Sequence, residues 1–415
     1  MSANSAAAAL GLLRLGGMQR SELFQLFTPE ALALLGSIGD LDAKADVVKL
    51  VSALRAEGYA PGLVAAVLTQ AKLRRRARKK FGDFTDGMLF TEDGLEQASR
   101  LQAAALHAGR FRGAGIKQVA DLGCGLGAES MAMGAIELNV RAFEIDEITA
   151  ALAVFNLGAF DNVEVEQADI TTLDLSKFEA LFFDPARREL DGKGERAARK
   201  FDPSQFSPNF DWVLEQARTK PSGIKLGPGH PHEAIAQDAE AQWLSIDGDL
   251  VELALWFGEV KRPKVARAAT VVNSTGRHEI VSDVFESESA EVGAIKNFIY
   301  EPDNAVVRSH LIADLARQVD ATLISKEIAY LTSDSEIDSP MMRGFRVIDE
   351  MAFDRKKLKA YLRDRKIGTL EIKKRGVDVV PEQLRKELNL KGEIAATLIL
   401  TRVGDDHRAL LAEAL

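Results

Sequence analysis

The chain has 415 residues, which is too long for one ordinary hydrophobic core and predicts two or three domains. Hydrophobic residues make up 46% and charged residues 28%, as in globular proteins, and no apolar run approaches the roughly 20 residues of a membrane helix. With one cysteine, Cys124, no intrachain disulfide is possible. These features, together with the lack of a convincing signal peptide, predict a cytoplasmic protein without a membrane partner.

The net charge of −9 argues against a nucleic-acid partner, but the charges are unevenly distributed. Residues 72–80 contain seven basic residues in nine positions. Residues 341–403 contain 16 Lys and Arg against 9 Asp and Glu, a balance of +7 that leaves −16 for the rest of the chain. Such asymmetry indicates contact with a polyanion. For residues 72–80, a solvated helix face is the alternative.

The first part of the chain, residues 1–82, predicts a small helical domain, because Ala and Leu recur at helical spacing. Helices are expected to begin at residues 28–30 and 40–42. Residues 58–61 contain Gly and Pro and predict a break before the basic helix.

Four acidic residues come at the ends of short apolar runs, at the spacing of successive β-strands: Asp121, Glu144, Asp169 and Asp184. Because the carboxyl ends of parallel strands meet at one edge of a sheet, all four are expected at that edge. Three glycines follow the first acid and allow the backbone to approach a ligand without a Cβ in the way: Gly123, Gly125 and Gly127.

Several of these residues have other interpretations. Asp121 could cap a helix, and Asp169 could be a turn residue. Glu144 and Asp146 lie on one face of a strand, so either could do the same job, and we favour Glu144 because it directly follows the apolar run. Asn156, in the next helix, is expected to fix that helix locally rather than to touch a ligand.

This arrangement resembles the class I S-adenosylmethionine (SAM)-dependent methyltransferases, whose first motif is an acidic residue followed by Gly-x-Gly-x-Gly. The resemblance implies that Asp121 and the three glycines form the turn under the methionine part of SAM. It also implies that Glu144 binds the ribose hydroxyls and that Asp169 approaches the adenine amino group. A dinucleotide-binding turn has similar glycines. Asp121 would repel a pyrophosphate, however, and can face the ammonium and sulfonium of SAM, so SAM is the expected cofactor.

The segment before the first motif folds over the cofactor in such methyltransferases, and Phe90 and Thr91 resemble its usual contact. Thr91 could instead only cap a helix that begins at Glu92. Cys124, within the glycine turn, is expected to fill space rather than to act as a nucleophile, because no base is evident nearby.

Residues 184–187, Asp-Pro-Ala-Arg, occupy the position of the family's fourth motif, beside the reactive methyl group. In the related Asp-Pro-Pro-Tyr motif, the carboxylate and a backbone carbonyl accept hydrogen bonds from an exocyclic amine. Asp184 and Pro185 are retained and are the expected catalytic residues. Arg187 replaces the aromatic residue, and it could stack on a base, bind a phosphate or form a surface ion pair. Arg188 is expected to be a further substrate contact.

The methyltransferase domain is expected over residues 83–280, as an α/β, Rossmann-like sheet of seven mostly parallel strands. Residues 222–226 predict its fifth strand. Residues 252–257 and 269–272 predict an antiparallel pair, which matches the last two strands of the family's sheet.

The remainder divides into a mixed connecting segment, residues 281–345, and a small α/β domain, residues 346–415, with the order helix, strand, helix, strand. The latter looks like the THUMP-like domain attached to a bacterial group of class I methyltransferases. THUMP domains are RNA-binding modules, so the resemblance implies RNA as a partner. Lys373, Lys374 and Arg375 are expected to be exposed and to meet phosphates.

The sequence therefore predicts a SAM-dependent methyltransferase that acts on structured RNA, either rRNA or tRNA. The alternatives are methylation of a protein or a small molecule, and a non-catalytic protein that binds SAM and RNA. No metal is expected. His230 and His232 lie on a proline-containing turn with no cysteine nearby, and two histidines alone are weak evidence for a metal site.

Overall fold

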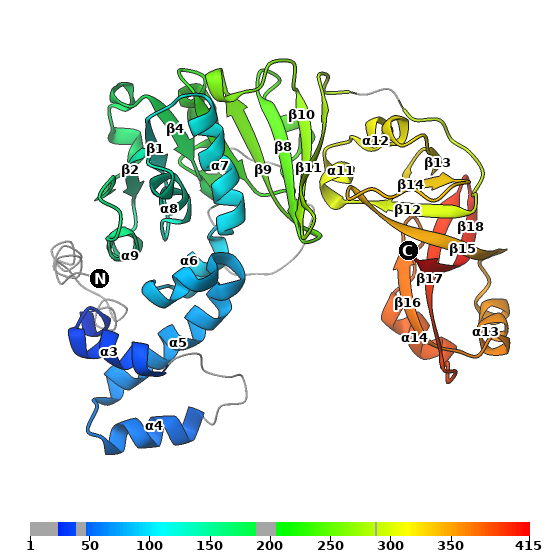
Figure 1. Ribbon diagram of the computed structural model, residues 1–415, viewed down its shortest axis with the longest axis horizontal. Coiled ribbons are helices and arrows are strands. Elements are labelled where there is room, and N and C mark those ends of the chain that lie inside the picture. The colour runs from blue at the N-terminus through cyan, green and yellow to red at the C-terminus, as the bar shows by residue number, and fades with distance from the viewer. Residues whose placement is uncertain (1–23, 39–46, 188–204, 287–288) are drawn as a thin grey trace. The chain divides into compact units, whose positions relative to one another are not determined.

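The computed structural model describes residues 24–38, 47–187, 205–286 and 289–415. The chain forms two compact units (Figure 1). The first unit comprises the chain up to Leu226 together with Trp256–Lys261, and the second comprises Gly227–Leu255 and Arg262–Leu415.

The first unit begins with the helices α3 (Pro29–Ile38), α4 (Val47–Ala56) and α5 (Pro61–Phe81). The predicted helix start at residues 28–30 is confirmed, because the Thr28 hydroxyl accepts a hydrogen bond from the Ala31 amide at 3.2 Å. The predicted break at residues 58–61 is also confirmed, with Pro61 in the first turn of α5. The start predicted at residues 40–42 lies outside the described residues.

A short connecting segment leads from α5 to the sheet. It consists of the 3-10 helix η1 (Gly82–Gly87) and the helices α6 (Glu92–Gln97) and α7 (Leu101–Gly113). Thr91 caps α6 by accepting a hydrogen bond from the Gly94 amide at 3.0 Å. The cap fixes the point at which the chain turns from the extended residues 88–91 into α6.

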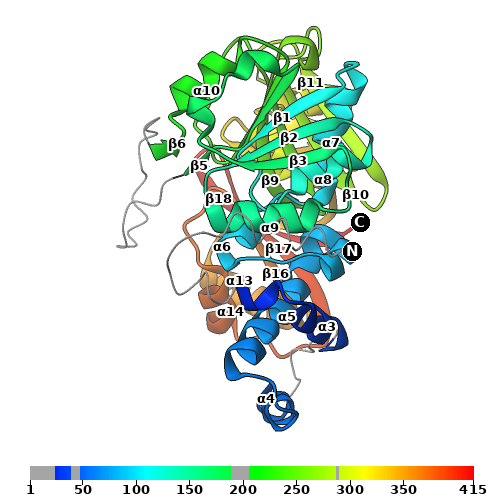
Figure 2. The same cartoon turned by 90° about the vertical axis from the view of Figure 1, so that its left-hand side faces the viewer.

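The sheet of the first unit is parallel, as expected, with the strand order β3-β2-β1-β4-β7 and the end of β9 beyond β7. Helix α10 lies on one side of this sheet and helix α9 on the other (Figure 2). The strands and helices are β1 (Gln118–Leu122), α8 (Ala128–Ala135), β2 (Asn139–Glu144), α9 (Glu147–Leu157), β3 (Val163–Gln167), β4 (Ala180–Phe183), α10 (Phe210–Ala217) and β7 (Ser222–Leu226). In register, Leu122 lies between Phe143 and Phe183, so the residues that follow β1, β2 and β4 meet at one edge.

The second unit contains β8 (Glu240–Ile246), most of β9 (Asp249–Phe257), β10 (Arg267–Asn273) and β11 (Gly276–Ser282). The predicted antiparallel pairing of residues 252–257 with residues 269–272 is wrong. β10 instead runs parallel to β8 and antiparallel to β11. The sheet that contains β1 has nine strands among the described residues, in the order β11-β10-β8-β9-β7-β4-β1-β2-β3, rather than the seven expected.

The rest of the second unit forms a seven-stranded sheet within the described residues, in the order β13-β14-β12-β15-β18-β17-β16. Its elements are β12 (Phe298–Pro302), α11 (Asn304–Arg308), α12 (Ile312–Gln318), β13 (Thr322–Ser325), β14 (Ile328–Ser333), β15 (Met342–Ala352), α13 (Arg355–Asp364), β16 (Ile367–Lys374), α14 (Pro381–Leu388), β17 (Ile394–Val403) and β18 (Asp406–Ala414). The predicted order helix, strand, helix, strand is confirmed by α13, β16, α14 and β17. Their common core includes Leu358, Leu384 and Leu398.

Within the described ranges, none of the helices combines the length and apolar character needed to cross a bilayer.

Candidate active site

A pocket of about 740 Å³ opens at the carboxyl ends of the parallel strands in the first unit. Six of the residues predicted from the sequence line it: Thr91, Gly123, Gly125, Glu144, Asp169 and Asp184. Phe90, Asp121, Gly127 and Pro185 are not among its lining residues. The position and size of this pocket fit a ligand of cofactor size at the carboxyl edge of an α/β sheet.

The glycine turn after β1 requires glycine for steric reasons. Gly123 has φ +98°, and a Cβ there would lie 2.9 Å from the Asp184 carbonyl oxygen. Gly127 has φ +92°, and a Cβ there would lie 2.7 Å from the Leu157 side chain. The turn therefore fits closely between the residue after β4 and helix α9, and its Gly125 faces the pocket.

Glu144 is positioned by two backbone amides. Its Oε2 accepts a hydrogen bond from Gly125 at 3.0 Å and its Oε1 accepts one from Asp146 at 2.9 Å. Burial raises the pKa of Glu144, and these two hydrogen bonds counteract the rise. Asp146 also lines the pocket, but its carboxylate accepts a hydrogen bond from the Thr149 amide as the N-cap of α9.

Asp121 lies beneath the glycine turn and is fully buried. Its Oδ2 accepts a hydrogen bond from the Ser130 hydroxyl at 2.5 Å, which connects β1 to the first turn of α8. Burial raises the pKa of Asp121 to about 7, although the Ser130 hydrogen bond acts in the opposite direction. Asp121 thus supports the turn from below rather than forming part of the pocket wall.

Asp169 lines the pocket from the loop after β3. Its Oδ1 accepts hydrogen bonds from the Thr171 amide and hydroxyl at 2.9 and 2.7 Å, and these lower its pKa. Both the predicted place at the sheet edge and the alternative of a turn residue therefore describe this side chain.

The segment over the pocket is held by long-range hydrogen bonds that the sequence did not indicate. Asn156 of α9 accepts a hydrogen bond from the Leu89 amide at 2.8 Å and donates to the carbonyls of Leu89 and Leu126. The expectation that Asn156 fixes its helix locally is therefore wrong, because its side chain binds Leu89 and Leu126, and it is not among the residues that line the pocket. Phe90 is buried against Phe81, and both of its backbone groups bind the Gln70 side chain.

The basic helix α5 binds residues 86–98, which include the segment over the pocket. The Lys80 ammonium donates to the carbonyls of Leu95, Glu96 and Ala98 at 2.8, 2.7 and 2.6 Å. Three arginines of the run also bind it: Arg74 the Met88 carbonyl, Arg76 the Glu92 carboxylate and Arg78 the Asp86 carboxylate. Burial, aided by the nearby Lys225 and Arg100, lowers the pKa of Lys80 to about 8. These four residues therefore make contacts within the chain, which neither the polyanion contact nor the solvated helix face predicted.

Lys80→Met is expected to weaken SAM binding about tenfold, because carbonyl groups at the end of α6 lose charged hydrogen bonds and the segment over the pocket loosens. Calorimetric titration with SAM measures this effect. Lys72→Met is the matched control, because Lys72 is exposed on the same helix and its loss removes the same charge. A Lys80 variant that binds SAM like wild type would contradict this role.

Asp184, which lines the pocket, has its carboxylate in an ion pair. Its Oδ2 is 2.5 Å from the Lys225 ammonium of β7, which also donates to the Ser99 hydroxyl at 2.9 Å. The Lys225 side chain is 12% exposed and that of Asp184 30%. The sequence indicated Lys225 only as part of a predicted strand. The pairing of β7 with β4, in which Ile224 is opposite Phe183, brings Lys225 next to Asp184.

Glu129 and His107 are a second pair that the sequence analysis missed. Glu129 lines the pocket, is only 3% exposed, and its Oε2 lies 3.1 Å from the His107 Nδ1. Burial opposes the charge of Glu129, but His107 and Lys225 together lower its pKa. Its Oε1 has no hydrogen-bond partner among the described residues. The pocket wall therefore holds a buried carboxylate with an unused acceptor oxygen.

The remaining predicted substrate contacts near this pocket are only partly described. Ala186 and Arg187 form the short strand β5 (Ala186–Arg187), which pairs with β6 (Phe206–Ser207). Arg188 lies outside the described residues. Cys124 is buried, and burial raises the pKa of its thiol, which agrees with its interpretation as a small residue of the turn.

The basic cluster predicted in the C-terminal domain is not freely exposed. Lys373 and Arg375 lie 2.6 and 3.4 Å from the Glu301 carboxylate, with side-chain exposures of 18% and 22%. The expectation of exposed side chains is therefore wrong for these two and holds for Lys374 alone. In the same unit, His232 stacks between Trp243 and His310.

Comparisons with known proteins agree with this geometry. A family model described as "THUMP domain-like" matches residues 342–414, and a "Domain of unknown function (DUF8688)" matches residues 19–77. Two Mycobacterium tuberculosis proteins, from strains CDC 1551 and H37Rv, are each named "Uncharacterized S-adenosylmethionine-dependent methyltransferase". Each is 29% identical over 357 residues, which cover 83% of this chain and 93% of the relative.

A crystal structure described as a "putative methyltransferase from Porphyromonas gingivalis W83" has a TM-score of 0.69 with 18% sequence identity. The alignment covers 86% of this chain and 91% of that one. The expected methyltransferase fold and the expected THUMP-like C-terminal region are thereby confirmed.

Proposed function

We propose that this chain, a SAM-dependent methyltransferase, transfers the methyl group of SAM to structured RNA. The observation that carries the proposal is one pocket that brings two groups of residues together. Glu144, Asp169 and the glycine turn form the first group, and Asp184, whose carboxylate pairs with Lys225, forms the second. We assign the first group, the cofactor side, to SAM and the second, the acceptor side, to the methyl acceptor.

The residues on the first side fit SAM. A carboxylate at the end of the second parallel strand is where an adenosine ribose is held in related sheets, and Glu144 occupies that place. The buried Glu129, with its unused Oε1, supplies negative charge that suits the positively charged methionine part of SAM. Asp121 supports the turn through Ser130, and Thr91 and Asp169 complete the wall.

When bound, SAM supplies a methyl group on a sulfonium, which an acceptor takes by in-line displacement. Positioning supplies most of the acceleration in such a reaction, so the protein must hold the acceptor's lone pair about 3 Å from the methyl carbon. The Asp184 carboxylate accepts a hydrogen bond from the acceptor's N–H and thereby fixes its direction. Lys225, itself held by Ser99, keeps that carboxylate in place and charged.

RNA as the acceptor is supported by two features. Residues 342–414 match a THUMP-like family model, and residues 341–403 carry a balance of +7 in a chain of net charge −9. A positive segment in an otherwise negative protein suits a phosphate backbone. Lys374 is exposed and remains a candidate phosphate contact, whereas Lys373 and Arg375 would first have to release Glu301.

The test is to incubate the protein with methyl-labelled SAM and either protein-free total RNA or the protein fraction, both from a strain that lacks it. The expected result is label in the RNA fraction alone. Label in the protein fraction, or in neither fraction, would contradict an RNA acceptor. For a comparison with Asp184→Asn, the matched control is Asp174→Asn, because Asp174 is exposed, caps the short 3-10 helix η3 (Leu175–Lys177) and is not among the residues that line the pocket.

A further inference from the structure

We propose that a hollow between β16 and α14 binds the phosphate backbone of an RNA strand; this inference rests on the proposed function and gives it a binding site. The hollow has a volume of about 420 Å³. Leu370, Leu388 and Leu390 form its apolar part, and Arg385 and Lys386 supply positive charge. No acidic residue is among the described residues that line it.

Two further lysines adjoin the hollow through close backbone contacts. Gly368 lines the hollow, and a Cβ built on it would lie 1.7 Å from the Gly392 carbonyl oxygen. Lys391 directly precedes Gly392. The Lys366 carbonyl, two residues before Gly368, accepts a hydrogen bond from the Ile394 amide at 3.1 Å. The backbone of Lys366 therefore lies close to that of Gly368, and Lys391 directly follows Leu390, so both lysines adjoin residues that line the hollow.

These lysines differ from several basic residues of the same domain that are held in ion pairs. Arg355 pairs with Glu387, Arg365 with Asp349, and Lys373 with Glu301. Lys366, Lys386 and Lys391 are exposed, and none forms an ion pair with an acidic residue in the part of the chain that the structure describes. Cations without acidic partners can neutralise phosphates without first breaking an ion pair.

The shape of the hollow favours a single-stranded segment over a regular duplex. Single strands expose unstacked bases that an apolar surface can cover, whereas an RNA helix presents mainly phosphates and hydroxyls. Leu390, which is partly exposed, can cover a base while Lys386, Lys391 and Lys366 meet the flanking phosphates as point charges. Because Arg385 donates to the Leu370 carbonyl at 3.3 Å, this guanidinium also fixes the wall of the hollow.

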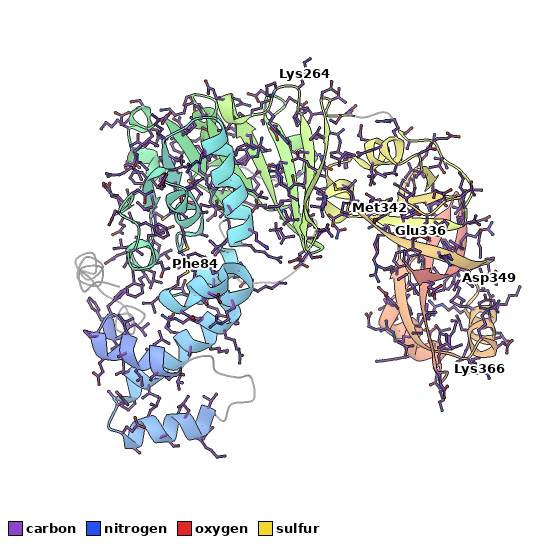
Figure 3. All side chains as sticks on the ribbon, in the orientation of Figure 1. Phe84, Lys264, Glu336, Met342, Asp349 and Lys366 are labelled. Atoms are coloured by element: carbon purple, nitrogen blue, oxygen red, sulfur yellow. The ribbon has the colours of Figure 1, made fainter. Side chains whose placement is uncertain are left out.

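The test compares two double variants with equal changes in charge. Lys386→Gln with Lys391→Gln alters the hollow. Lys264→Gln with Lys326→Gln is the control, because Lys264 lies in another loop of this unit, away from Lys366 (Figure 3), and Lys326 lies in the β13–β14 turn at the opposite edge of the seven-stranded sheet. All four side chains are exposed, and thermal unfolding verifies that both variants fold.

The measurement is the affinity for a fluorescent single-stranded RNA oligonucleotide by anisotropy, over a series of salt concentrations. Losing two phosphate contacts should reduce the slope of log K against log salt by about 1.4, since each contact on a single strand contributes about 0.7. Affinity at low salt should fall about tenfold or more, and the control should match wild type. An equal salt slope in the hollow variant and wild type, or no RNA binding by wild type at low salt, would overturn the inference.

Two further outcomes keep this inference separate from the proposed function. If the hollow variant loses RNA affinity as expected but wild type puts no label into RNA, the proposed function fails and the binding site stands. Inorganic polyphosphate with the same number of charges should compete less well than unlabelled RNA, because it offers Leu390 no base. Equal competition would overturn the part of the inference that places a base in the hollow.

Discussion

Asp184→Asn is expected to reduce methyl transfer roughly ten- to a hundredfold while SAM affinity stays near that of wild type. The variant removes the charge that accepts the acceptor's hydrogen bond, and a hydrogen bond to a charged group contributes about 1.5–3 kcal/mol. It does not alter the cofactor side, where Glu144 binds the amides of Gly125 and Asp146. Single-turnover rates at saturating SAM, together with calorimetric SAM titrations, separate the two effects.

Two Lys225 variants are compared with Asp184→Asn in the same test. Lys225→Gln should also slow transfer, because the Asp184 carboxylate loses its 2.5 Å ion pair. Lys225→Arg should restore part of the rate if charge next to Asp184 is what matters, whereas a merely structural role would not favour the charged variant. If Asp184→Asn weakened SAM binding as much as turnover, Asp184 would belong to the cofactor side instead.

Glu144→Gln is expected to weaken SAM binding by roughly ten- to a hundredfold, because one charged acceptor contributes about 1.5–3 kcal/mol. Glutamine keeps the size of the side chain but has only one acceptor oxygen. It can therefore accept from the Gly125 or the Asp146 amide, while its NH2 group would face the other amide. Turnover at saturating SAM should change little, since the Glu144 carboxylate binds the Gly125 and Asp146 amides and is assigned to the cofactor. Calorimetric titration measures the affinity directly.

Asp146→Asn provides the comparison for Glu144. Asp146 lies two residues further along and lines the same pocket, but its carboxylate caps α9 through Thr149. Its substitution should leave SAM affinity within about threefold of wild type, since an asparagine caps helices about as well as an aspartate. The reverse order, with Asp146→Asn the more damaging change, would reassign the ribose contact to Asp146.

The carboxyl edge of the sheet was predictable because the sequence features that indicate it lie close together in the chain. A short apolar run, an acidic residue and a glycine turn follow one another within about ten residues of Asp121 and fix a strand, its end and the turn. Parallel strands bring such ends together whatever the rest of the chain does, so Glu144, Asp169 and Asp184 all reach one pocket. The order of elements in the C-terminal domain was predictable for the same reason.

Pairings between distant segments were not predictable in this way. An apolar run such as residues 269–272 shows that a strand forms but not which neighbour it chooses, and β10 pairs with β8 and β11 rather than with β9. Lys225 and Glu129 looked like ordinary strand and helix residues. Their partners Asp184 and His107 lie 41 and 22 residues away, so only the folded chain brings them together.

The basic segments illustrate the same limit for charge. The sequence shows that residues 72–80 and 373–375 are positive, but not which acids or carbonyls meet them. In the structure, Lys80 binds carbonyls at the end of α6, and Lys373 pairs with Glu301, 72 residues away. The cations left without acidic partners, among them Lys386 and Lys391, were not distinguished by sequence from those that are paired.

Nucleoside analysis of the methylated RNA tests the central claim most directly. RNA from a strain lacking the protein is incubated with SAM and wild type or Asp184→Asn, digested to nucleosides and examined by mass spectrometry. The account predicts that one nucleoside gains a methyl group on a nitrogen with wild type and gains it roughly ten- to a hundredfold more slowly with the variant. A methyl group on no nucleoside, or the same methylated nucleoside at the same rate with Asp184→Asn, would contradict it.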